Sequence, residues 1–183
     1  AAGQLRFEIE AAFSQGLPNT PMANATLRVI SGNFLTARPV GIVDGIDFKN
    51  SGVVRKVDAV AIRRAIDTGA VVLLSPFGFS PTGEAFNLTM EDVATSTAIA
   101  LQADKLMFIT EVPGVRENND DANSDIDTEL SLADAERILA ALPAPTRPTD
   151  VAFYLRHCVR ACREGVDVLK IVRKTRDMAT LPV

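Results

Sequence analysis

One segment, VVLLSPFGFSPTGEAFNLTMEDVA from Val71 to Ala94, constrains the fold more than any other part of the chain. Its first four residues, Val71–Leu74, are all apolar and predict a strand that is buried on both faces of a sheet. Thr89 and Asp92 have the T-x-x-D spacing of a capping box, so a helix is expected to begin there. A strand that leads into a capped helix is the building unit of α/β folds.

The residues between this strand and this helix form the candidate ligand site. Gly78, Pro81 and Gly83 predict an irregular loop, because glycine and proline break regular structure. The first amides of a helix have no partner within it, and α/β sheets usually place ligands beside such amides at the carboxyl end of a strand. Asn87 can hydrogen-bond a substrate there, and Glu91 can organise cationic groups around a transferring phosphoryl or acyl centre. The alternative for Glu91 is a structural role, in which its charge complements the helix dipole.

The rest of the chain continues the alternation of strands and helices. Three or four apolar strands separated by helices indicate an α/β fold, with a mainly parallel sheet and helices on both of its faces. We expect Val71–Leu74 and Lys105–Thr110 to be parallel, central strands of that sheet. The other expected strands are at 26–31 and 166–172, the expected helices are at 5–13, 58–68, 90–102, 131–142 and 150–163, and the Gly-interrupted run 33–58 is expected to form a hairpin or flap.

The expected helix after position 58 has clear end signals. Asp58 is its predicted N-cap and Gly69 its predicted stop. Helical periodicity places Val60, Ala61, Ala65 and Ile66 on the face that points inward. In the same way, Val93, Thr97, Ala98 and Leu101 are expected on one face of the helix over 90–102.

Composition limits the classes of function. At 183 residues, of which 47% are apolar, the chain can bury one substantial core, so residues 1–183 are expected to form a single domain. The net charge of -4, the single Tyr and the lack of Trp disfavour nucleic-acid binding. No apolar segment approaches the roughly 18 to 20 residues of a membrane helix, and no signal peptide is recognised at the start. We therefore expect a soluble cytoplasmic protein that binds neither nucleic acid nor membrane.

A metal site is not expected. Cys158 and Cys162 are the only cysteines, and with the only histidine, His157, they would still lack a fourth zinc ligand. The acidic stretch before position 130 resembles a calcium loop only at its start, because Ile126 stands where glycine is required and Leu132 where a bidentate glutamate is required. Reduced, buried thiols and a solvated acidic loop are the simpler interpretations.

Two quoted segments resemble a known family. From Phe86 to Val115, FNLTMEDVATSTAIALQADKLMFITEVPGV resembles the core of the amino-acid kinase family, in its acetylglutamate branch. Upstream, ISGNFLTARPVGIVDGIDFKNSGVVRKVD and TGEAFNLT are more similar to bacterial N-acetylglutamate synthases than to acetylglutamate kinases. The resemblance implies an αβα sandwich with a mainly parallel central sheet, of the carbamate kinase-like type. In the kinases the first half of this fold binds the acyl-amino acid and the second half binds nucleotide.

The resemblance also implies roles for individual residues. Asn87 falls on the asparagine with which the kinases hold acetylglutamate, and Gly78 and Gly83 belong to the same expected substrate pocket. Glu91 falls on the kinases' organising aspartate, which would make it catalytic only in a chain that is competent as a kinase. Tyr154 falls on a lysine of the kinases and brings no positive charge to a transferring phosphoryl. Phosphoryl transfer is therefore not expected.

The second half of the chain carries the nucleotide-pocket-like residues. Thr110, Glu111 and Gly114 fall on the strand end and the loop that lie beside nucleotide in the kinases. The family's first strand, its glycine-rich phosphate loop and its acetyltransferase domain have no counterpart here, so the chain is expected to be the C-terminal part of an amino-acid kinase-like domain, incomplete at its N-terminus.

The resemblance implies a regulatory and oligomer-forming part of an N-acetylglutamate synthase, an enzyme that uses acetyl-CoA and glutamate. Arginine is the expected effector, and the chain itself is expected to need no cofactor. The runner-up is acetylglutamate kinase with ATP and magnesium. An alternative from another class is a non-catalytic module that senses an amino acid or holds an oligomer together.

Overall fold

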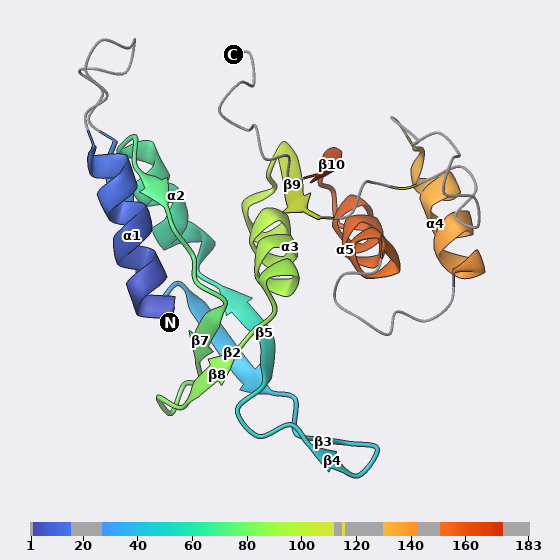
Figure 1. Cartoon of the computed structure of the whole chain (residues 1–183), viewed down its shortest axis with the longest axis horizontal. Helices are drawn as coiled ribbons and strands as arrows, with labels where there is room; N and C mark the ends of the chain where they lie inside the picture. Colours follow the sequence, from blue (N-terminus) through green and yellow to red (C-terminus); the bar gives the residue numbers. More distant parts are fainter. Residues whose placement is uncertain (1, 16–26, 112–114, 116–129, 143–150, 174–183) are drawn as a thin grey trace. The chain divides into compact units, whose positions relative to one another are not determined.

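The computed structural model describes residues 2–15, 27–111, 115, 130–142 and 151–173. They belong to two compact units, Ala1–Leu101 and Gln102–Val183, which are described separately. The elements of the first unit (Figure 1) are α1 (Ala2–Ser14), β1 (Val29–Ile30), β2 (Leu35–Pro39), β3 (Ile42–Val43), β4 (Ile46–Asp47), β5 (Gly52–Val57), α2 (Ala59–Asp67), β6 (Val71–Val72), β7 (Phe77–Phe79), β8 (Ala85–Asn87) and α3 (Met90–Leu101). Those of the second are β9 (Lys105–Thr110), α4 (Leu132–Ala141), α5 (Val151–Arg163) and β10 (Val168–Arg173). Among the described helices, none is long and apolar enough to cross a bilayer.

Helix α2 begins and ends where the sequence predicts. The Asp58 carboxylate accepts a hydrogen bond from the Ala61 N–H at 3.0 Å, which is the N-cap interaction. At the other end Gly69 has a φ of 78°, and its N–H donates to the Ile66 carbonyl at 2.8 Å. A residue with positive φ directly after a helix is how many helices end, and glycine adopts it without strain.

The prediction of which residues of α2 point inward is wrong in part. Val60 and Ile66 are 61% and 46% exposed, whereas Ile62 is 1% exposed. The buried face is centred on Ile62, with Ala61 and Ala65 half-buried beside it. Val60 lies two residues before Ile62 and therefore points to nearly the opposite side of the helix, and Ile66 lies in the last turn.

The hairpin that was expected within 33–58 is confirmed. Strands β2 and β5 pair antiparallel, and β3 pairs with β4 in the connection between them. Figure 1 shows β3 and β4 extending beyond the ends of β2 and β5. Asp44 and Gly45 have φ values of 50° and 79°, as a two-residue turn of type I′ requires.

The segment that was predicted as an irregular loop is instead a β-hairpin. Strand β7 pairs antiparallel with β8 and parallel with β2. Gly78 is buried inside β7, where an added Cβ would lie 3.0 Å from the Ala37 Cβ and 3.1 Å from the Leu88 Cδ1. Glycine is needed because the strands approach closely, and not because the chain is irregular. Gly83, with φ 89°, does occupy the turn of this hairpin.

The two edges of the four-stranded sheet meet. Its strand order is β5-β2-β7-β8, and yet the Asn87 N–H donates to the Asn50 carbonyl at 2.8 Å, beside an isolated parallel bridge between Ser51 and Asn87. The sheet therefore curls until β8 touches the start of β5. Gly52 permits the contact, because an added Cβ would lie 2.7 Å from the Phe86 Cβ. One cluster of buried apolar residues in this unit consists of Leu35, Ala37, Phe86, Leu88 and Val93.

The strand expected at Val71–Leu74 is shorter and more exposed than predicted. Strand β6 spans Val71–Val72 and pairs parallel with β1, and Val71 is 37% exposed. An apolar run does not show how many faces of a strand are covered, and β1 is the partner strand of β6 in the described residues. In the other unit β9 pairs with β10. That β6 and β9 share one central sheet stays a prediction, because the two strands belong to different units.

In the second unit, β9 has the predicted bounds. It pairs parallel with β10 in a continuous register from Lys105 opposite Val168 to Thr110 opposite Arg173. Burial alternates along β9, so that one face of the strand is covered, whereas a strand buried throughout was expected. One cluster of buried apolar residues in this unit contains Val115, Ala135, Leu155 and Val159.

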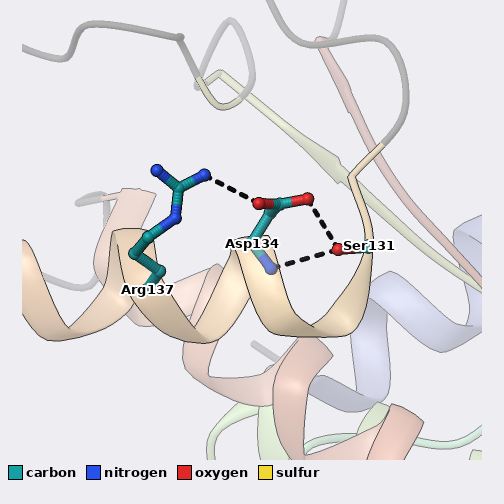
Figure 2. Close-up of polar contacts among 3 residues, drawn as sticks. All are labelled: Ser131, Asp134 and Arg137. Carbon is teal, nitrogen blue, oxygen red and sulfur yellow. Dashed lines mark hydrogen bonds and ion pairs between the residues drawn. The ribbon is translucent and has the colours of Figure 1, made fainter.

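Helix α4 is capped by a small polar network (Figure 2). The Ser131 Oγ accepts from the Asp134 N–H at 3.1 Å and donates to the Asp134 carboxylate at 2.6 Å. Arg137 forms an ion pair with the same carboxylate at 2.7 Å. The hydrogen bond from Ser131, and then that from Arg137, hold the pKa of Asp134 below its ordinary value.

The first prediction concerns the closed edge. Replacing Gly52 by Ala places a methyl group 2.7 Å from the Phe86 Cβ and 2.9 Å from the Arg38 carbonyl oxygen, so a strand must shift. We expect a loss of roughly 1 to 3 kcal/mol in the free energy of unfolding, measured by denaturant titration. Gly3→Ala is the matched control, because nothing lies within 4 Å of its added Cβ. Equal stability of the two variants would contradict the close contact.

The second prediction concerns the cap of α4. Because the folded-state pKa of Asp134 is lowered, its ionised form stabilises the fold above the unfolded-state pKa, and this stabilisation is lost as the pH falls through that range. Ser131→Ala should lower the melting temperature at pH 7, and the difference from wild type should shrink below about pH 4. If the difference in melting temperature between wild type and Ser131→Ala stays constant between pH 7 and acid pH, the Asp134 carboxylate does not contribute to the cap.

Candidate functional site

The candidate site lies at the junction of β8 and α3, residues 85–92. Asn87 ends β8, Thr89 caps α3, and Glu91 and Asp92 lie in the first helical turn. The predicted cap is confirmed, because the Thr89 Oγ1 accepts from the Asp92 N–H at 3.2 Å. The helix start is thus formed locally, as its T-x-x-D spacing indicates.

The backbone of Asn87 is fixed by strand pairing, and its side chain is exposed. Its N–H donates to the Asn50 carbonyl, and it faces Phe77 in the β7–β8 ladder. The residue is exposed, and its carboxamide makes no hydrogen bond to the described residues. A fixed backbone with an available carboxamide suits a group that donates to and accepts from a small polar ligand.

Glu91 follows Asn87 by four residues in the sequence, and its side chain is half-buried. Its position in the first turn complements the helix dipole, so the structural alternative is satisfied. Its carboxylate has no hydrogen-bond partner among the described residues, which is compatible with a role toward a ligand as well.

The two predicted glycines differ in what they do. Gly83 lies in the exposed turn of the β7–β8 hairpin, where an added Cβ would meet nothing within 4 Å. Gly78 is a packing residue inside β7 and is buried. Gly78 therefore helps to place the hairpin that carries Asn87, and its strand position differs from the loop position from which a pocket role was predicted.

Asp92 is the residue of this site that local sequence patterns missed. Its Oδ2 accepts from the Val54 N–H of β5 at 2.9 Å, and its Oδ1 accepts from the Ser96 Oγ at 3.2 Å. The sequence pattern assigned it only to the cap with Thr89. A contact with a strand so distant along the chain leaves no local signal, and only the closed sheet brings the two together.

The nucleotide-pocket-like residues belong to the second unit. Thr110 is buried at the end of β9, and Glu111 after it is exposed. Gly114 lies outside the described residues, as do the acidic loop and the C-terminal tail. The Tyr154 ring centroid lies 5.7 Å from that of Phe108. Tyr154 thus packs against an aromatic residue of β9, and its correspondence to a lysine of the kinases stays a prediction.

Both cysteines of α5 have a thiol pKa above the ordinary value. Burial raises the pKa of the Cys158 thiol to about 12, and burial followed by the charge of Asp167 raises the pKa of Cys162. A thiol with a raised pKa remains protonated at neutral pH, whereas the thiolate is the reactive and metal-binding form. Within the described ranges no group of three or more potential ligands is placed to hold a metal ion.

A cavity of about 410 Å³ lies between α4 and α5 of the second unit. It is lined by Arg156, Arg160 and Arg163 among others, with Leu139 and Val159 on its apolar side. The Arg163 guanidinium pairs with Glu136 at 2.7 Å, so part of the positive charge is already neutralised. None of the predicted site residues lines this cavity, and the β8–α3 junction remains the better candidate on chemical grounds.

Comparisons with known proteins identify the family. The model of the amino acid kinase family matches residues 6–173. The amino-acid acetyltransferase of Ralstonia nicotianae is 56% identical over 166 residues, which are 91% of this chain and 35% of that protein. The amino-acid acetyltransferase of Edwardsiella ictaluri is 42% identical over 182 residues, 99% of this chain and 40% of that protein.

Solved structures agree with this result. The N-acetylglutamate synthase of Neisseria gonorrhoeae, in complex with coenzyme A and N-acetyl-glutamate, has a TM-score of 0.77 and 32% identity over 94% of this chain and 36% of its own. The complex of that synthase with coenzyme A and L-arginine has a TM-score of 0.79 and 33% identity over 96% of this chain and 39% of its own. Carbamate kinase from Giardia lamblia, with a TM-score of 0.72 and 12% identity, shares the fold.

The chain spans about 35 to 40% of the length of the curated relatives that it matches. The match to the family model covers most of the chain, and the expected α/β fold of the amino-acid kinase type is confirmed by these structural neighbours. The chain belongs to the amino acid kinase family, and the relatives at 32% identity or more reported above are amino-acid acetyltransferases and an N-acetylglutamate synthase.

Proposed function

We propose that the chain is the amino-acid kinase-like part of an N-acetylglutamate synthase, which transfers acetyl from acetyl-CoA to glutamate at the start of arginine biosynthesis. The observation that carries the proposal is the match to the gonococcal synthase over 94 and 96% of this chain at TM-scores of 0.77 and 0.79. The same matches cover only 36 and 39% of the synthase. In this proposal, acetyl transfer and the binding of acetyl-CoA belong to residues outside this chain, and the enzyme is cytoplasmic.

For the chain itself we propose a regulatory and oligomer-forming role, without a cofactor of its own. Its ligands would be small amino acids: glutamate or acetylglutamate at the β8–α3 junction, and arginine as effector. The exposed carboxamide of Asn87 beside the first turn of α3 supports the first of these. The arginine proposal draws on the gonococcal relative, which has been captured with L-arginine.

Acetylglutamate kinase is the second candidate, because Asn87 and Glu91 retain the carboxamide and the carboxylate that the kinases use. Phosphoryl transfer also needs positive charge around the migrating group. Tyr154 has no such charge at the position of the kinases' lysine. A module that only senses an amino acid or holds an oligomer together is the alternative without catalysis.

The third prediction separates synthase from kinase. The full-length protein should acetylate glutamate with acetyl-CoA, and it should not phosphorylate acetylglutamate with ATP and magnesium above background. Both rates can be measured on one preparation by mass spectrometry of the products. Phosphorylation that disappears in Asn87→Ala would establish the kinase and reject the synthase assignment.

The fourth prediction tests the ligand site. In Asn87→Ala a ligand amide or carboxylate loses its partner, so titration calorimetry of the full-length protein should show acetylglutamate binding weakened by about 1 to 3 kcal/mol. The melting temperature should change little, because the carboxamide makes no hydrogen bond to the described residues. Asn50→Ala is the matched control, since its carbonyl, which holds Asn87, is retained. Equal affinity of wild type and Asn87→Ala would remove Asn87 from the site.

A further inference from the structure

The side chain of Asp92 connects the start of α3 to strand β5. One carboxylate oxygen accepts from the Val54 N–H at 2.9 Å, and the other accepts from the Ser96 Oγ at 3.2 Å. The Asp92 N–H is itself bound to the Thr89 Oγ1. One half-buried residue thus takes part in the helix cap and in a bond to a neighbouring strand. A hydrogen bond from an amide to a carboxylate is stronger than one between neutral groups.

The Val54 bond continues a row of contacts along one edge of β5. The carbonyl of Asn50 accepts from the Asn87 N–H, Gly52 lies against β8, and the N–H of Val54 is bound by Asp92. These are alternate residues, and alternate residues of a strand direct their backbone groups to the same edge. Strand β8 is therefore attached to this edge by its main chain, and helix α3 is attached to it by one side chain.

A bulge lies next to this attachment. Thr36 faces Lys56, and Ala37 faces Val54, so Arg55 is an extra residue of β5. A bulge bends its strand and increases the local twist, which redirects the neighbouring backbone groups. The Val54 N–H thus lies where the pairing of β5 with β2 is irregular. It donates to the Asp92 carboxylate, as it would to a backbone carbonyl of a neighbouring strand.

We propose that Asp92 is a positioning residue for the ligand site at Asn87. By binding Val54 it fixes the first turn of α3 against β5. Asn87, which is joined to that turn by a short connection and bound to the same edge, is thereby held in place. The proposal rests on the proposed function, because it assigns Asp92 an effect on a ligand that Asn87 binds. It makes Asp92 responsible for ligand affinity without contact between its side chain and the ligand.

The fifth prediction tests the attachment without any ligand. In the full-length protein, Asp92→Ala should speed hydrogen exchange of the Val54 and Asn87 amides about tenfold, as expected for the loss of a hydrogen bond to a charged group. Asp92→Asn retains one acceptor oxygen and should restore part of the protection. Ser96→Ala removes the hydrogen bond from the Ser96 Oγ to the carboxylate and should leave both amides near their wild-type rates. Unchanged exchange at Asn87 in Asp92→Ala would overturn the proposal.

A double-mutant cycle tests the effect on binding. Below the melting temperature of every variant, Asp92→Ala should weaken acetylglutamate binding about tenfold, and it should weaken it no further when Asn87 is already Ala. A full additional loss in the Asn87→Ala background would show that Asp92 does not act through Asn87 and would overturn the proposal. If Asn87→Ala alone leaves the affinity unchanged, the ligand site fails instead, and the exchange rates still decide whether Asp92 positions Asn87.

Discussion

The closure of the curled sheet on itself is the constraint on which the first unit depends. Where β8 meets the start of β5, the Asn87 N–H reaches the Asn50 carbonyl, and Gly52 leaves room for Phe86. A side chain at either glycine of this layer, Gly52 or Gly78, would force the strands apart. The small core that contains Leu35 and Phe86 can therefore form only with this backbone spacing. Asn87, a candidate ligand-binding residue, lies where β8 meets the start of β5.

The same residues thus form the candidate site and stabilise the fold around it. The main chain of Asn87 takes part in the closure, and its side chain remains available for chemistry. Thr89 follows the end of β8 by two residues and caps α3. Such coupling is common where α/β proteins bind ligands at the junction between a strand and a helix, because rigid elements hold a polar group more precisely than a free loop does.

The sequence predicted well those features whose signals are local. The caps at Asp58 and Thr89, the stop at Gly69 and the bounds of β9 depend on residues a few positions apart. Features that depend on distant partners were missed or wrong. Gly78 was interpreted as a loop glycine because its contact with Ala37 is invisible in the local sequence, and Asp92 as a cap residue because Val54 lies in another strand. The exposure of Val60 and Val71 likewise depends on which neighbours cover them.

The two thiols of α5 have a practical consequence. Cys158 is buried and burial raises its pKa to about 12, so it is protonated at neutral pH, and Cys162 is half-buried with a raised pKa. Maleimides and related probes react with thiolates. A cysteine introduced at an exposed position, such as the tip of the β3–β4 hairpin, would therefore react faster than Cys158, and half-buried Cys162 would be the remaining background of this chain. A probe could thus be attached at that tip while both cysteines of α5 are retained.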